Sequence, residues 1–244
     1  MRMPVVAMVG AAFRFEGPLG KRHGKAQATD HVIQHVIVQI ARPACADLQG
    51  HMPIAEVITG PREQNGFVEV DMESHPHVDP TLRIVTEMHE RYGSVRAVIQ
   101  AYLYRSEADA AALARLGVPV RLCKGAYLEP ATVAFPRKSQ VNENYKRLAE
   151  ILLKKGVYPA IATHDPDMVN HALAFAASRG IPKDGFEFQM LYGIRRDLQE
   201  RLMAEGYRLR LYVPYGSAWY PYFMRRLAER PANLLFLARN LFRR

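Results

Sequence analysis

The sequence predicts an α/β protein built as a (βα)8 barrel of the TIM type, irregular or incomplete at its N-terminus. From Phe67 onward, six strand-like segments alternate with helical segments, which is the pattern of a parallel sheet with right-handed crossovers. Polar residues recur near the C-terminal end of strand after strand, where a barrel of this type assembles its site. The fingerprint Gly-x-Gly-x-x-Gly of an open, dinucleotide-binding sheet is absent from the sequence.

The six βα units have readable strands and helix ends. Ser106 is a predicted helix N-cap with Asp109 at the capping-box position, and Asp165 followed by Pro166 is a second predicted N-cap. Glycines are expected to end the helices: Gly117, Gly156, Gly180 and Gly206. The predicted strands are FVEVDME, RAVIQAYLY, VRLCKGAYL, YPAIATHD, FEFQMLYG and RLRLYVPYG.

Residues 1–66 have to supply the first two units of such a barrel. The stretch HVIQHVIVQIA fits a strand or part of a helix, and its period does not decide between them. We therefore divide the chain into an atypical N-terminal segment, residues 1–66, and a barrel, residues 67–244. The first segment is expected to be a truncated or altered barrel start.

Composition describes an ordinary globular protein. The chain has 244 residues, of which 49% are hydrophobic and 23% are charged. Two cysteines make neither a disulfide framework nor a metal quartet, and no apolar stretch approaches the roughly 18 residues of a membrane span. The short apolar run after Arg2 lacks the cleavage context of a signal sequence. We therefore expect a cytoplasmic protein.

Positive charge is concentrated near the C-terminus. Residues 195–244 hold 11 arginines against four acidic residues, whereas residues 67–194 hold 15 basic and 15 acidic groups. A basic tail can bind nucleic acid or an anionic membrane surface. Aromatic residues are not interleaved as base stacking requires, so solvated helical arginines are the preferred interpretation. No nucleic-acid partner is predicted, and peripheral membrane contact stays an alternative.

Several motifs together resemble the proline dehydrogenase family, specifically its short monofunctional bacterial members. They are DMES, VIQAYLY, VRLCKGAYLEP, ATHD, FEFQMLYGIR, LYVPYG and YFMRRLAER. The resemblance runs from about residue 66 to the C-terminus. It implies a distorted (βα)8 barrel that holds FAD without a Rossmann motif. It also implies oxidation of L-proline to Δ1-pyrroline-5-carboxylate, with hydride passing from substrate C5 to flavin N5 and electrons passing to a quinone, the first step of proline catabolism.

The N-terminal segment departs from the family pattern. Members carry a Lys-Leu-Thr or Lys-Leu-Ser tripeptide on the second strand, whose lysine helps to bind the substrate carboxylate, and residues 1–66 contain neither. Two alternatives to an active proline dehydrogenase therefore stay open. One is a catalytically impaired barrel remnant, and the other is a barrel enzyme that acts on another amino acid.

The stretch WYPYFMRRLAER is expected to hold the substrate carboxylate. On a helix, Tyr222, Arg225, Arg226 and Glu229 fall at i, i+3, i+4 and i+7, which is one face. Two guanidinium groups there can bind a carboxylate bidentately, and Glu229 can orient Arg225. The alternative is a solvated helix with an i,i+4 ion pair.

Two cations near the end of a strand that is otherwise suited to burial need an explanation. Strand alternation places Arg121 and Cys123 on one face and Leu122 and Lys124 on the other. Burying an unpaired charge costs several kcal/mol. Arg121 and Lys124 are therefore expected to reach solvent, to pair with a carboxylate such as Asp71, or to face a polar or anionic ligand.

The resemblance assigns roles to the remaining site residues, with core packing or solvated loops as the competing interpretation of each. It implies catalytic roles for Asp71, Arg121 and Tyr127. Substrate-binding residues are Arg225, Arg226, Tyr212, Tyr222, Leu191 and Glu229. Cofactor-binding residues are Gln100, Arg121, Lys124, Gly125, Ala126, Tyr127, Arg137, Lys138, Thr163, His164 and Gln189. No metal is predicted, because no second ligand stands at metal-binding spacing around His164.

Overall fold

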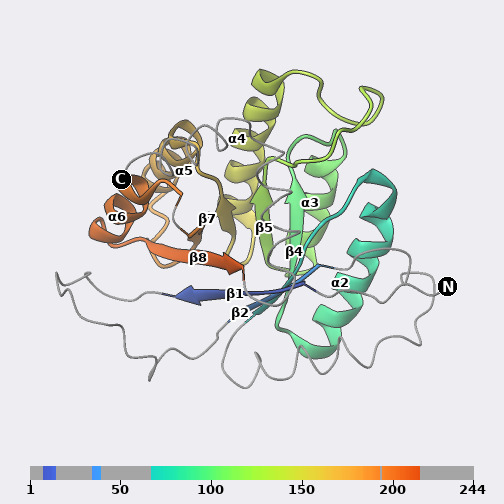
Figure 1. Cartoon of the computed structure of the whole chain (residues 1–244), viewed down its shortest axis with the longest axis horizontal. Helices are drawn as coiled ribbons and strands as arrows, with labels where there is room; N and C mark the ends of the chain where they lie inside the picture. The colour runs from blue at the N-terminus through green and yellow to red at the C-terminus, as the bar shows by residue number, and fades with distance from the viewer. Residues whose placement is uncertain (1–7, 15–34, 40–66, 193, 215–244) are drawn as a thin grey trace, which may run out of the picture.

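A computed structural model describes residues 8–14, 35–39, 67–192 and 194–214, in which six parallel strands form a curled half-barrel. Strands β3 to β8 pair in chain order, each parallel to the next, and the helices cover the outer face of the curled sheet (Figure 1). The strands are β3 Phe67–Val70, β4 Val95–Gln100, β5 Val120–Cys123, β6 Ala160–Ala162, β7 Glu187–Leu191 and β8 Arg208–Pro214. The helices are η3 His75–His77, α2 Val78–Tyr92, α3 Ser106–Arg115, α4 Lys138–Lys155, α5 Pro166–Ser178 and α6 Arg196–Ala204.

Two strands from the N-terminal segment complete the ring in this structure. Strand β2, His35–Gln39, pairs parallel with β3, and β1, Met8–Arg14, pairs antiparallel with both β2 and β8. The expected barrel of eight parallel strands is therefore not confirmed, whereas the six parallel strands β3 to β8 and the five α-helices between them are. An antiparallel strand satisfies the backbone groups at the edges of β2 and β8 as well as a parallel one does.

The hydrophobic core lies between the outer face of the sheet and the helices. Outward-facing strand residues such as Val120, Leu122 and Ile161 are buried, and they belong to one apolar cluster with Leu148 and Leu152 of α4. Alternation along each strand sends these side chains outward and sends the intervening residues into the interior of the ring. The sequence pattern thus decides which residues can face a ligand.

Helices α3, α4, α5 and α6 each end one or two residues before the glycine expected to end them, whereas the two expected N-caps have different outcomes. The Asp165 side chain accepts a hydrogen bond from the backbone N–H of Asp167, as expected of an N-cap, and α5 begins at Pro166. Ser106 is instead the first residue of α3, after the N-cap Arg105. The expected Ser106 cap was wrong because the hydroxyl of Ser106 donates 2.5 Å away to the carbonyl oxygen of Gln100 at the end of β4.

Among the described residues, four buried charged side chains lie in the interior of the ring: Glu69, Arg96, Glu187 and Arg210, here called the interior ionic network. Nη1 of Arg96 lies 2.7 Å from Glu69 and 2.7 Å from Glu187. Arg210 donates to both carboxylate oxygens of Glu187, at 2.9 and 2.8 Å. Since Arg96 lies on β4 and Glu187 on β7, three strands further along the ring, these side chains meet across its interior.

The network compensates the cost of burying its charges. The side chains of Glu69 and Arg96 are fully buried, and isolated ions in that environment cost several kcal/mol each. The two negative carboxylates and the two positive guanidinium groups neutralise one another. The guanidinium group of Arg96 also lies over the ring of Phe67, 4.9 Å from its centroid. Burial alone raises the pKa of the Glu187 carboxyl, but Arg96 and Arg210 outweigh it and hold that pKa well below its usual range.

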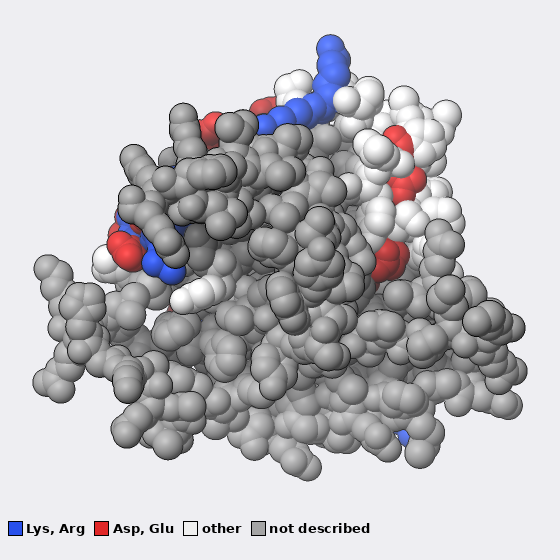
Figure 2. Space-filling model, viewed as in Figure 1, with Lys and Arg blue, Asp and Glu red and all other residues white. Residues whose placement is uncertain are grey.

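The outer surface of the described residues carries mixed charge. In Figure 2 the acidic and basic side chains of this part occur singly or in small groups on the visible face. No helix among the described residues combines the length and apolar character needed to cross a bilayer.

Replacing Arg96 should destabilise the fold strongly. We expect Arg96→Met to lower the free energy of unfolding by about 3 to 5 kcal/mol, because Glu69 and Glu187 lose their shared partner while staying buried. Arg147→Met is the matched control, since Arg147 pairs with Glu107 on the surface and should contribute about 0 to 1 kcal/mol. Urea unfolding of both variants measures the difference, and equal losses would contradict the account.

Stability should depend on the ionisation of Glu187 in acid. The pKa of Glu187 is lower in the folded protein than its usual value of 4.5, so its stabilisation is complete above that pH and is lost as the pH falls below it. Glu187→Gln binds no proton there, so its stability should fall less steeply between about pH 5 and pH 3 than that of the wild type. Glu200→Gln, on the exposed face of α6, should keep the wild-type slope. Unfolding midpoints measured across this range test the difference.

Candidate active site

The C-terminal ends of the parallel strands bring the predicted site residues to one edge of the sheet, here called the mouth of the ring. Asp71 directly follows β3, Gln100 ends β4, and Arg121 lies on β5. His164 follows β6, and Tyr212 lies near the end of β8. Parallel strands present their C-terminal ends at the same edge, so residues distant in sequence come together there.

Arg121 forms an ion pair at this mouth. Its Nη1 lies 2.7 Å from Oδ1 of Asp71 and 3.9 Å from Oε2 of Glu69. Burial lowers the pKa of Arg121, but Asp71 and Glu69 more than offset it and keep the guanidinium charged. Nε of Arg121 is buried and has no hydrogen-bond partner among the described residues. One of the expected pairings is thus present, and it leaves a fixed cation with an unused donor.

Lys124 is held on the outer side of the same strand end. Its Nζ donates to Oδ2 of Asp165 at 2.6 Å and to Oδ1 of Asn142 at 2.7 Å. Burial raises the pKa of Asp165, but the hydrogen bonds from Lys124 and from the backbone N–H of Asp167 outweigh it and lower that pKa. Lys124 therefore ties β5 to α4 and α5, and one of its three donors is left for a ligand.

The turn after β5 requires glycine. Gly125 has φ +99°, and a Cβ built there would lie 2.0 Å from Cδ1 of the Tyr102 ring. The positive φ and the short distance to Tyr102 both exclude a side chain at position 125. The backbone of the turn therefore lies directly against the Tyr102 ring. The next two residues, Ala126 and Tyr127, are exposed, and the Tyr127 hydroxyl donates to the Glu73 carboxylate.

Two buried glutamines have well-defined amide orientations. Nε2 of Gln189 donates to Glu69 at 2.5 Å and to Glu187 at 2.8 Å, so it reaches into the interior ionic network. Nε2 of Gln100 donates to the carbonyl oxygen of Met72 at 3.2 Å. Oε1 of Gln100 is buried and has no partner among the described residues.

Thr163 and His164 both serve local structure. Oγ1 of Thr163 accepts a hydrogen bond from the backbone N–H of Asp165 at 3.1 Å. Nε2 of His164 accepts from the backbone N–H of Leu191 at 2.8 Å, so the neutral ring carries its proton on Nδ1. These bonds fix both side chains, and they leave their predicted cofactor contacts as predictions.

Arg137 and Lys138 are exposed at the beginning of α4, an arrangement suited to an anion. The first N–H groups of a helix lack intrahelical acceptors and attract phosphate. The bond between Lys124 and Asn142, in the second turn of α4, places this helix end beside the end of β5. The predicted carboxylate clamp, by contrast, lies outside the described residues: Tyr222, Arg225, Arg226 and Glu229.

Reasoning from the sequence missed the interior ionic network and Asn142. The available signal was alternation: Glu69 and Asp71 share a strand face, as do Arg96 and Gln100, and Glu187 lies two residues before Gln189. Charged residues at alternate positions of buried strands indicate a polar interior. The pairing among them depends on ring geometry and cannot be read from alternation.

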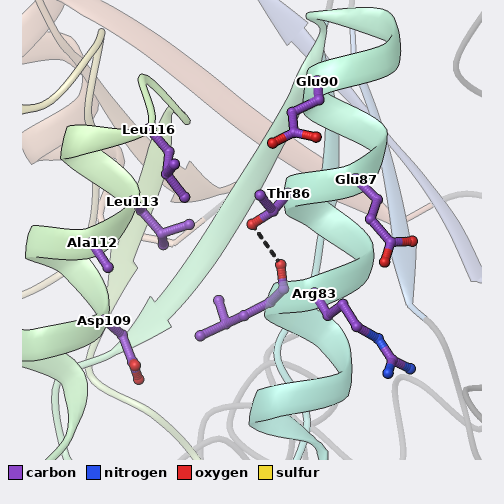
Figure 3. Close-up of a pocket in the computed structure, with 9 residues that line it drawn as sticks. Arg83, Thr86, Glu87, Glu90, Asp109, Ala112, Leu113 and Leu116 are labelled. Carbon is purple, nitrogen blue, oxygen red and sulfur yellow. Dashed lines mark hydrogen bonds between the residues drawn. The ribbon is translucent and has the colours of Figure 1, made fainter.

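A cavity on the outside of the fold is separate from this site. It has a volume of about 330 Å³ and lies between α2 and α3 (Figure 3). Its lining includes Arg83, Glu87, Glu90 and Asp109, all on helices, and no residue from a strand end. The cavity therefore lacks the convergent groups found at the mouth of the ring.

Comparison with known proteins identifies the family. The family model described as proline dehydrogenase matches residues 14–239, and so begins within the segment in which no resemblance was expected. The chain belongs to the proline dehydrogenase family. Proline dehydrogenase of Deinococcus radiodurans is 49% identical over 189 residues, which is 77% of this chain and 61% of that protein. Proline dehydrogenase 2 of Bacillus subtilis is 50% identical over 170 residues, or 70% of this chain and 56% of that protein.

Solved structures of proline utilization A share the fold. The protein from Bdellovibrio bacteriovorus, inactivated by N-propargylglycine, has a TM-score of 0.65 and 31% identity, covering 72% of this chain and 21% of that one. The protein from Bradyrhizobium japonicum has a TM-score of 0.68 and 26% identity, covering 85% and 24%. The chain thus spans about three fifths of the curated proline dehydrogenases and about a quarter of these larger proteins.

The Gly125 turn offers a direct test of the site's geometry. Gly125→Ala should cost about 1 to 3 kcal/mol more stability than Gly93→Ala, since both glycines have positive φ but only a Cβ at Gly125 meets a ring. Thermal or urea unfolding measures the two variants. Equal losses would show that Tyr102 does not lie against the turn.

Proposed function

We propose that this chain oxidises L-proline to Δ1-pyrroline-5-carboxylate with FAD as its cofactor. The observation that carries the proposal is the identity of 49% and 50% with two bacterial proline dehydrogenases. The family match also spans every residue that we assign to the site. We further propose that the ring of strands is the family's distorted barrel, with β1 and β2 standing in the place of its first two strands.

The residues at the mouth fit a flavin. The unpartnered carbonyl oxygen of Gln100 and the unused Nε donor of Arg121 offer one acceptor and one donor to a heteroaromatic edge. The backbone of the Gly125 turn, packed against Tyr102, would form one wall beside a flat ring. Arg137 and Lys138, at the beginning of α4, would bind the pyrophosphate. FAD bound there would accept the two electrons released by the substrate.

The chain's own residues would then bind and orient proline. Arg225 and Arg226 are proposed to hold its carboxylate, and Tyr127 and Tyr212 to enclose the ring. Loss of hydride from C5 and of a proton from the nitrogen forms the C=N bond of the product, with no nucleophile or metal required. Arg121, kept charged between Asp71 and Glu69, favours accumulation of negative charge beside it. A quinone is proposed as the final electron acceptor.

The test is proline-dependent bleaching of the purified protein loaded with FAD. We expect loss of the flavin absorbance on adding L-proline, recovery on adding a quinone, and formation of the pyrroline product. Arg121→Met should lower the rate of bleaching about 100- to 1,000-fold, because it removes a cation that we propose to lie beside the flavin. Arg147→Met, on the surface, is the control and should bleach at the wild-type rate.

Two results would overturn this proposal in different ways. Protein that folds but binds no FAD would indicate a non-catalytic remnant of the family. Protein that binds FAD but is bleached only by another amino acid would indicate a different substrate.

A further inference from the structure

We infer that Glu69 and Glu187 are positioning residues, which orient the amide of Gln189 so that it presents its carbonyl oxygen to the ligand. This inference rests on the proposed function, since the ligand is taken to be FAD. It adds a positioning role for two buried carboxylates of the interior ionic network.

The orientation follows from the chemistry of the two carboxylates. Ionised carboxylates only accept hydrogen bonds, and Nε2 of Gln189 lies 2.5 Å from Oε1 of Glu69 and 2.8 Å from Oε1 of Glu187. The two hydrogens of the amide nitrogen are therefore both used. Reversing the amide would place its oxygen against two negative oxygens, which is strongly unfavourable. Only the carbonyl oxygen is left for a ligand.

The guanidinium groups hold both carboxylates in place. Arg96 donates to Glu69 and Glu187 through one nitrogen, and Arg210 donates to both oxygens of Glu187. The Gln189 side chain is itself buried, with 6% of its surface exposed, so water does not compete freely for its amide. The network therefore determines which end of the amide is available.

Gln100 also presents a carbonyl oxygen to the site. It lies on β4, before β5 in the ring, whereas Gln189 lies on β7, after β5. Its nitrogen donates to the carbonyl oxygen of Met72, and its own Oε1 is buried without a partner among the described residues. Two fixed acceptors thus serve one site, beside the cationic donor Arg121. A ligand that satisfies both must itself donate, as the ring imide N–H and the ribityl hydroxyl groups of FAD do.

A double-mutant cycle on FAD affinity tests the positioning role. Glu69→Gln can accept and donate, so it frees the Gln189 amide to rotate. We expect it to weaken FAD binding about five- to tenfold, the equivalent of one net hydrogen bond. In the Gln189→Leu background, the same substitution should change FAD affinity less than about twofold, because no amide is left to orient. Fluorescence quenching of FAD measures all four dissociation constants.

Equal weakening in both backgrounds would overturn the inference, since it would show that Glu69 acts through the fold or through Arg121 and not through the Gln189 amide. If Glu69→Gln does not fold, Glu187→Gln takes its place in the cycle. Complete failure of the wild type to bind FAD would instead overturn the proposed function.

An NMR measurement without cofactor completes the test. The side-chain NH2 resonances of Gln189, assigned by their loss in Gln189→Leu, should exchange with solvent at least about tenfold more slowly than those of an exposed glutamine. Fast exchange would show that the amide is not held by the carboxylates, whatever the outcome with FAD.

Discussion

The carboxylate of Glu187, held between Arg96 and Arg210, is the interaction on which the rest of this structure depends. Barrels of this type are usually filled by branched aliphatic side chains. Here two acids and two arginines, all nearly or fully buried, connect β3, β4, β7 and β8 across the interior. Burying any one of these four charges without the others would be energetically unfavourable, so they are stable in the interior only when paired. The curvature of the sheet therefore has to bring them within hydrogen-bond distance.

This network also determines what the mouth of the ring can offer. The Glu69 carboxylate lies 3.9 Å from Nη1 of Arg121 and accepts a hydrogen bond from the Gln189 amide. A single carboxylate therefore contacts both a cation and an amide that face the site. Asp71 holds the same guanidinium from the side. The result is a preorganised set of donors and acceptors held in place by the protein. Such preorganisation is what a site needs when a bound cofactor carries out the chemistry.

The sequence predicts the parts of the fold that local rules govern, and less of what long-range geometry governs. The six parallel strands with the helices between them, the cap at Asp165 and the proximity of Arg121 to Asp71 follow from alternation, capping and charge. The antiparallel direction of β1 does not, because a short apolar segment pairs equally well either way. Ser106 fits a cap by composition, yet its hydroxyl bonds to the preceding strand end. The pairing of Glu187 with Arg96, 91 residues apart, depends on ring closure.

A crystal structure of the protein with FAD tests most directly whether the interior network prepares one site at the mouth. The account predicts the isoalloxazine ring at the C-terminal ends of β4 and β5. Arg121 should lie within hydrogen-bond distance of that ring, and the carbonyl oxygens of Gln100 and Gln189 should face the cofactor. A flavin bound elsewhere, or a Gln189 amide whose nitrogen faces the cofactor, would contradict it.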